Sequence, residues 1–201
     1  MPVKPLTTLC IAAVLSLIHG CAVTEQMQRN FQEASEAYYA PEQLNGDPQE
    51  TGLLLIDAVT EKLFNTMPLS GVAISNIDTP ATPILVGSFK KGGILSQLSG
   101  VVVVPNLQPG TYRIIKINTQ NANMWEAFPL PANKPFEVQV RRGQLSYLGQ
   151  IHVKHPVGTT NREVSILHDK RREAEAWSMV VDKYGGSPWS DAITARIKEL
   201  K

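Results

Sequence analysis

Between residues 52 and 168 the sequence consists of short apolar runs separated by turn residues. The runs are rich in Val, Ile, Leu, Tyr and Phe, several of which favour extended strands. We predict strands at residues 53–59, 71–76, 83–89, 101–104, 112–118, 136–140, 145–152 and 162–167. No helical periodicity of useful length fits this part of the chain. The pattern therefore predicts a mainly β domain over residues 51–168.

The spacing of the runs bears on how the strands pair. The predicted strands start about 9 to 24 residues apart, which leaves little room for the crossover helices that parallel neighbours require. We therefore expect mostly antiparallel pairing. The predicted fold class is an antiparallel β-sandwich with an N-terminal helix and a C-terminal helical hairpin.

One phrase inside the β domain carries a family resemblance. Residues 104–114 read VPNLQPGTYRI, in which Pro109 and Gly110 form a turn and Tyr112 returns to the core. This phrase is similar to one in prealbumin-like sandwiches, which include carboxypeptidase regulatory-like domains, and residues 136–149 resemble that family's closing hairpin. The resemblance covers residues 52–153 and implies a fold. It implies little about function, because such folds host many roles.

Two apolar stripes at helical spacing occupy residues 169–201. They are Ala174, Trp177, Val181 and Tyr184, then Trp189, Ile193, Ile197 and Leu200. Gly185 and Gly186 separate the two helices, and Ser187 is expected to cap the second, with Pro188 at its first position. We expect a helical hairpin whose stripes are covered either by the sandwich or by a partner protein.

The start of the chain has a basic residue, then a short apolar run, then a cysteine. Lys4 precedes an apolar run of 13 residues, 6–18, which as a helix spans about 20 Å. This is short for a bilayer core of about 30 Å, and it suits a signal peptide. The run ends LIHGC, in which Ile18, Gly20 and Cys21 resemble the lipobox of bacterial lipoprotein precursors, whereas His19 departs from it.

The lipobox resemblance implies a signal peptide at residues 1–20 and lipidation of Cys21 by fatty acids such as palmitate. The alternatives are a plain secreted protein or an N-terminal helix that happens to contain a cysteine. Ala22, rather than Asp, follows the cysteine. By the sorting pattern of lipoproteins, this favours the outer membrane, with the protein facing the periplasm.

Residues 21–50 are expected to hold the lipidated end, a helix and a linker. Residues 24–39 lack Gly and Pro, and Met27, Phe31, Ala34 and Tyr38 share one helical face. The stretch 41–50 that follows is rich in turn residues and reads as a linker. The alternative for the whole segment is a flexible tether.

Charge and cysteine content limit the partners. The full chain carries 19 basic and 18 acidic residues. Cleavage would remove Lys4, so the net charge of the mature side chains would be 18 − 18 = 0. A neutral chain has no net field that would gather nucleic acid.

Cys10 would leave with the signal peptide and Cys21 would carry lipid, so the mature domain is expected to fold without a disulfide.

We find no sequence pattern for catalysis, a metal or a cofactor. His152 and His155 are a possible metal pair, but residues i and i+3 on a strand point to opposite faces. The hydrolase motif Gly-x-Ser-x-Gly and the phosphate-binding glycine loops are absent. We therefore expect a non-enzymatic protein that binds a partner or assists envelope assembly.

Two further features could mediate binding. Trp125 and Phe128 lie in the Asn- and Pro-rich stretch 118–134, where they could form a glycan or small-ligand platform or could plug one end of the sandwich. The basic residues at 170–172 begin a helix, where positive charge opposes the helix dipole. We expect Asp169, Glu173 or an anionic lipid headgroup to compensate that charge.

Overall fold

The structure is a computed structural model that describes residues 38–62, 65–79, 82–89, 99–120, 125–130, 136–155 and 162–201. The side chains of Lys62, Asn65 and Trp125 are not described. The predicted signal peptide, Cys21 and nearly all of the helix expected at 24–39 lie outside the described residues. The predictions for these segments stay predictions.

In the described residues, a run of strands is followed by two helices. The strands are β1 (Gly52–Lys62), β2 (Asn65–Asn76), β3 (Ile84–Gly87), β4 (Val101–Leu107), β5 (Gly110–Gln120), β6 (Trp125–Pro129), β7 (Glu137–Val140), β8 (Leu145–Lys154) and β9 (Glu163–Leu167). The helices are α2 (Lys170–Tyr184) and α3 (Ser190–Glu199). The chain is therefore mainly β with two C-terminal helices, as the sequence predicted.

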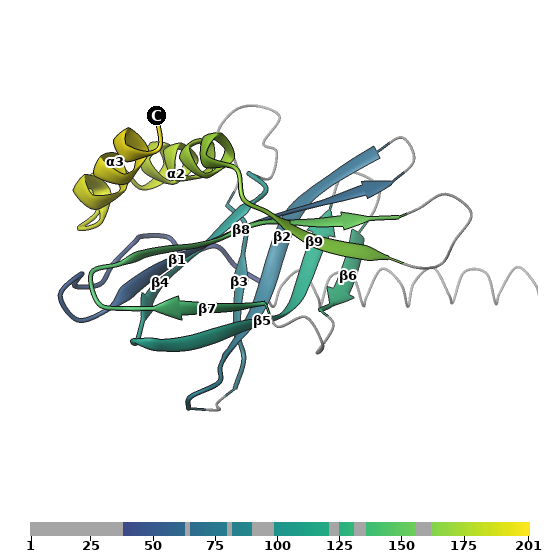
Figure 1. The fold of residues 1–201 in the computed structure, drawn as a ribbon. Coiled ribbons are helices and arrows are strands. Elements are labelled where there is room, and N and C mark those ends of the chain that lie inside the picture. The colour runs from purple at the N-terminus through teal and green to yellow at the C-terminus, as the bar shows by residue number, and fades with distance from the viewer. Residues whose placement is uncertain are drawn as a thin grey trace, which may run out of the picture. The chain divides into compact units, whose positions relative to one another are not determined.

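The strands form one curled, mixed sheet rather than a plainly antiparallel sandwich (Figure 1). Its main path runs β6-β5-β2-β1-β8-β9, while β3, β4 and β7 pair with β2, β1 and β5. Most pairs are antiparallel, but β1 and β8 are parallel, with Leu53 beside Leu145 and Glu61 beside Lys154. The prediction of an antiparallel sheet is wrong at this pair, because the crossover it requires is made by the intervening strands and not by a helix.

Each of the eight predicted strands is present, and the structure adds a ninth. The added strand is β6, which lies in the Asn- and Pro-rich stretch 118–134, where we predicted no strand after residue 118. Its backbone pairs with β5 from Lys116 beside Pro129 to Gln120 beside Trp125. β6 lies at one end of the sheet path, where a proline is tolerated because one side of the strand is free of ladder hydrogen bonds.

Strands β1 and β4 are buried on both faces, which explains their unbroken apolar runs. Leu54 and Ile56 point into the core enclosed by the curled sheet. Leu53 and Leu55 point to the opposite face, where they pack with side chains of α2 and α3. Strand β4 alternates in the same way: Val102 and Val104 belong to the first core, Val101 and Val103 to the second.

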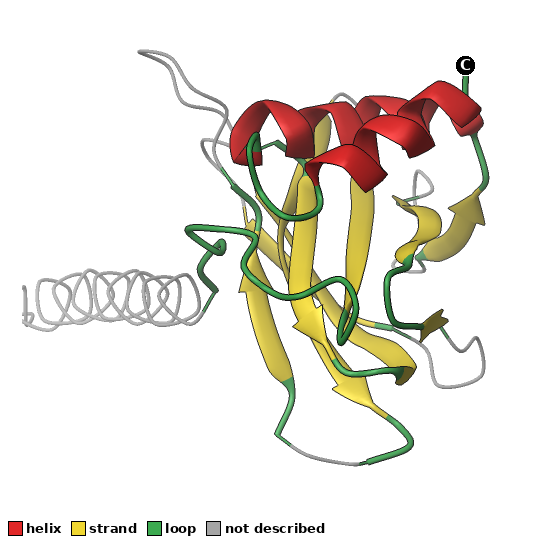
Figure 2. Ribbon diagram, turned by 90° about the vertical axis from the view of Figure 1, so that its left-hand side faces the viewer, coloured by secondary structure: helices red, strands yellow, loops and turns green. Residues whose placement is uncertain are grey.

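Helices α2 and α3 lie side by side over one face of the sheet (Figure 2). Trp177 and Trp189 are fully buried there, beside Ile193 and Tyr184. The sheet therefore covers the two apolar stripes, which is one of the two expected alternatives. None of the helices in the described ranges is long and apolar enough to cross a bilayer.

The start of α3 differs from the prediction. The helix begins at Ser190 with Trp189 as its N-cap, and Trp189 makes no capping side-chain bond. Ser187 instead accepts the Ser190 N–H with its backbone oxygen at 3.0 Å. The cap falls at Trp189 because its ring is buried in the core between the hairpin and the sheet, and this burial outweighs the capping preference of Ser187.

Candidate functional site

One carboxylate is fully buried in the layer between the sheet and the helices. Asp57 lies on β1, on the same face as Leu53 and Leu55, and its side chain has an exposed fraction of 0%. A buried charge is costly unless it is paired and hydrogen-bonded. The partners of Asp57 therefore decide what this region can do.

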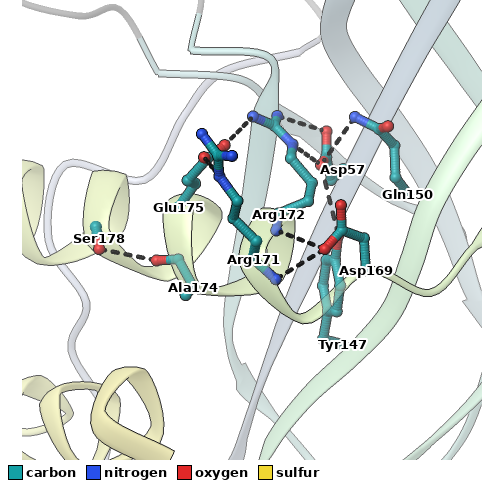
Figure 3. A network of polar contacts seen from close by, with 9 residues as sticks. All are labelled: Asp57, Tyr147, Gln150, Asp169, Arg171, Arg172, Ala174, Glu175 and Ser178. Atoms are coloured by element: carbon teal, nitrogen blue, oxygen red, sulfur yellow. Dashed lines mark hydrogen bonds and ion pairs between the residues drawn. The ribbon is translucent and has the colours of Figure 1, made fainter. Parts of the chain in front are cut away.

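The main partner of Asp57 comes from the first turn of α2. Arg172 places its guanidinium against the carboxylate, with Nε 2.6 Å from Oδ2 and Nη2 3.0 Å from Oδ1 (Figure 3). Two parallel N–H···O bonds of this kind fix both direction and distance, and a guanidinium provides the geometry for them. The Arg172 side chain is 25% exposed, so the pair lies at the margin of the layer.

Two residues of β8 complete the shell around the carboxylate. Gln150 donates from Nε2 to Oδ2 of Asp57 at 3.2 Å, and the Tyr147 hydroxyl donates to the same oxygen at 3.5 Å. Burial, followed by the nearby negative charge of Asp57, raises the pKa of the Tyr147 phenol. The hydrogen bond to Asp57 is the largest cause that raises the pKa of Arg172.

The basic start of α2 is compensated from within the protein. Asp169 caps the helix and accepts the backbone N–H groups of Arg171 at 2.8 Å and Arg172 at 3.4 Å. Asp169 was one of the three candidates, and its role is confirmed. Glu173 instead accepts from Nε of Arg196 on α3 at 2.9 Å. Asp57, the strongest partner, was missed, although a lone acid inside the run LLLIDAV was a usable signal.

The geometry determines which chemistry this cluster can perform. Both oxygens of Asp57 accept from Arg172, and Oδ2 accepts from two further donors. A carboxylate held in this way is a poor general base, since its lone pairs are already used. The cluster joins the helical hairpin to the sheet, and we interpret it as a positioning site rather than a reaction centre.

The two histidines considered as a metal pair have different partners. Nε2 of His152 lies 2.9 Å from Oε1 of Glu61, and Nε2 of His155 lies 3.4 Å from Oε2 of Glu126. Across the part of the chain that the structure describes, no three His, Cys, Asp or Glu side chains come together as a metal site would require.

Phe128 is the predicted ligand-binding residue whose side chain the structure describes. Phe128 is only 2% exposed and packs in the core enclosed by the sheet. The guanidinium carbon of Arg162 lies 4.5 Å from the centre of its ring, and the ring of His155 lies 5.8 Å away. The Phe128 ring is therefore part of the packed core. The Trp125 side chain and Cys21 lie outside what the structure describes.

Comparisons with known proteins show limited likeness. No protein-family model matches the sequence, and no curated protein matches it. A solved leucine-rich repeat protein from Bacteroides thetaiotaomicron aligns with 68% of this chain and 16% of its own length, at 12% identity and a TM-score of 0.34. A minor pilin of Streptococcus agalactiae aligns with 56% of this chain and 48% of its own length, at 19% identity and a TM-score of 0.32. Scores at this level assign neither fold family nor function.

Proposed function

We propose that the chain is a lipid-anchored, non-enzymatic protein of the bacterial envelope that binds a partner or assists assembly on the periplasmic side of the outer membrane. The observation that carries the proposal is the order of features before Cys21. A basic residue, an apolar run of 13 residues and the ending LIHGC occur in the order of a lipoprotein signal. Attachment of two or more acyl chains at one residue makes membrane release very slow.

Two charged pairs join the elements of the domain to one another. Asp57 and Arg172 neutralise each other inside the domain, and they hold the hairpin over the sheet. Glu173 and Arg196 join the two helices to each other at 2.9 Å. These groups stabilise one rigid arrangement, as expected of a domain that presents a fixed surface.

A prealbumin-like fold is part of the same proposal. Tyr112 is 3% exposed, and its hydroxyl donates to the backbone oxygen of Gln108 at 3.0 Å across the Pro109–Gly110 turn. The burial of Tyr112 is what we expect of a tyrosine that returns to the core after such a turn. It supports the family resemblance of residues 104–114.

The alternative role, a glycan or small-ligand module, now depends on Trp125 alone. Phe128 offers no exposed ring face, because its side chain is buried in the core. A sugar stacks on an exposed aromatic face, so the second candidate loses one of its two predicted residues.

Metabolic labelling with a radioactive fatty acid tests the anchor. We expect label on the intact chain and on Cys10→Ser, because Cys10 lies in the segment that is removed. We expect none on Cys21→Ser. Label that persists on Cys21→Ser would refute lipidation at this residue.

Crosslinking in intact cells, followed by capture through a tag after Lys201, tests the binding role. We expect a specific envelope protein to be recovered with the anchored chain. Recovery of the same proteins with an unrelated lipoprotein of similar abundance would count against it.

A further inference from the structure

Residues 38–46, which lie between the proposed anchor and strand β1, pack on the domain. They overlap the segment 41–50 that we interpreted as a linker. Within them, Leu44 is 1% exposed and belongs to the core between the sheet and the helices, against which the partly buried Ala40 also packs. We call residues 38–46 the strap. The chain is therefore attached to the folded domain before the first strand begins.

Two glycines on neighbouring strands make room for the start of the strap. Gly71 of β2 and Gly87 of β3 are register partners. A Cβ at Gly71 would lie 2.6 Å from the ring of Tyr38, and one at Gly87 would lie 2.8 Å from the backbone oxygen of Tyr38. Glycine within a strand often marks a place where another backbone approaches closely. The N–H of Gly87 also donates to the backbone oxygen of Tyr39 at 3.0 Å, so the strap begins directly on the sheet.

The later part of the strap contacts α2 and the end of β4. The Tyr184 hydroxyl, at the end of α2, donates to the backbone oxygen of Pro41 at 2.8 Å. A Cβ at Gly46 would meet the side-chain oxygen of Asn106, so the strap passes close to β4 at this point. The strap therefore connects the β2–β3 part of the sheet with the helical hairpin.

The contacts of the strap are few and follow one another along the chain. Among the described residues, one backbone hydrogen bond joins the strap to the sheet and one side-chain hydrogen bond joins it to α2. The side chains of Tyr39, Glu42, Gln43 and Asn45 are exposed. A segment with few buried apolar contacts opens at a lower free energy than strands of the core. The strap can therefore separate from the domain while the sheet stays folded.

We propose that the strap is a releasable segment that gives the anchored domain two tether lengths. This inference rests on the proposed anchor at Cys21. While the strap is docked, the tether ends at Tyr38. After release it ends at Asp47, which adds 47 − 38 = 9 residues and up to about 30 Å of reach at about 3.3 Å per residue. The released domain therefore reaches partners that lie farther from the membrane.

Hydrogen exchange measures release on the full chain, processed in cells and reconstituted in lipid vesicles. We expect the strap amides to exchange at least about tenfold faster than those of β1, because the strap opens without the sheet. Leu44→Ala should accelerate strap exchange several-fold further, since it removes the buried side chain of the strap. Leu167→Ala makes the same change at a side chain that is 44% exposed. This matched control should leave strap exchange unchanged.

Gly87→Ala gives a second route to release. Its Cβ would meet the backbone of the strap rather than the end of a flexible side chain, so the start of the strap must move away from β3. We expect strap exchange to accelerate here as well, while exchange in β1 stays as in the parent chain.

Energy transfer from a dye on the domain to acceptor-labelled lipids measures the reach. After processing, Cys10 would be removed and Cys21 would be blocked by lipid. Thr194→Cys, at an exposed position of α3, then supplies the one free thiol for the donor dye. We expect less transfer in the two release variants than in the Leu167→Ala control, because the longer tether raises the mean distance from the membrane.

The outcomes separate the strap from the anchor. Strap exchange as slow as that of β1 overturns the inference, and so does equal transfer in the release variants and the control. A parent chain that does not float with vesicles refutes the anchor and, with it, the gain in reach. Cys21→Ser, which we expect to lack lipid, should keep the strap exchange of the parent chain, because the docking contacts lie within residues 38–201.

Discussion

The two faces of strand β1 are buried in different ways. The face toward the curled sheet carries hydrocarbon side chains, such as Leu54 and Ile56, and one buried hydroxyl, Thr60, which is hydrogen-bonded to Thr119. The face toward the helices contains Leu53 and Leu55, but its next member is the charged Asp57. One strand thus contributes to an apolar core on one side and to a buried ion pair on the other.

The difference shows how stability and position are divided between the two faces. Apolar side chains can repack in several arrangements with small changes in free energy. A bidentate pair between Asp57 and Arg172 has one geometry, and any other docking of α2 leaves a buried charge without a partner. We infer that apolar burial supplies most of the free energy, while the ion pair selects where the hairpin sits.

Removal of the carboxylate should have the largest effect. Asp57→Ala removes the buried partner of Arg172, whose guanidinium keeps Glu175 at 3.8 Å and is 25% exposed, so the loss should lie at or below the lower end of the range of about 3–5 kcal/mol that breaking a buried pair costs. We expect the free energy of unfolding, measured with urea, to fall by about that amount.

Two variants sharpen this prediction. The double variant Asp57→Leu with Arg172→Met replaces the pair by apolar groups and should recover most of the loss. Arg171→Ala removes a neighbouring ion pair on the surface, in which the side chains of Arg171 and Glu175 are 87% and 46% exposed. This variant should lower the free energy of unfolding by less than about 0.5 kcal/mol. Equal losses in Asp57→Ala and Arg171→Ala would refute the distinction between the two arginines.

The pattern of apolar runs predicted most of the fold, because strand runs and helical stripes are local. It did not predict β6, whose residues 125–129 include a proline and gain their strand conformation from pairing with β5. It also did not predict that β1 and β8 are parallel, because that pairing joins segments far apart in the sequence.

The buried pair was harder to predict than the strands. The basic cluster at 170–172 pointed to an acidic partner, and the helix cap Asp169 was found because capping acts over a few residues. Asp57 lies 115 residues from Arg172, and sequence spacing contains no information on such a contact. The unusual position of Asp57 in an apolar run identified a residue that needs a partner, but it did not identify which one.

Neighbouring valines of β4 compare the two faces directly. Val102 and Val103 are 0% and 1% exposed, and they point to the inner core and to the helices, respectively. Replacing either by alanine removes about two methylene equivalents and should cost about 2 kcal/mol, cavity included. Hydrogen exchange should separate the two variants, with faster exchange in α2 for Val103→Ala than for Val102→Ala. Equal exchange in α2 would show that the hairpin does not open independently of the sheet.

Alkaline pH should weaken the helix-facing side through its tyrosines. Burial raises the pKa of Tyr184 to about 12 from an ordinary 10.0, and burial together with Asp57 raises that of Tyr147. Because both folded values exceed the unfolded one, the stabilisation is complete below about pH 10 and is lost as the pH rises through the folded values. Each phenol contributes a slope of up to about 1.4 kcal/mol per pH unit.

Urea unfolding at intervals between about pH 9 and pH 11 measures this loss. Tyr184→Phe keeps the ring, which packs against Phe89 with ring centroids 5.5 Å apart. It removes the hydroxyl group that titrates, and with it the 2.8 Å hydrogen bond to the backbone oxygen of Pro41. The variant should be less stable at neutral pH by about 1 kcal/mol, and it should have a shallower alkaline slope. An unchanged slope would mean that the Tyr184 phenol meets solvent in the folded protein, and the close packing between helices and sheet would then be refuted at this residue.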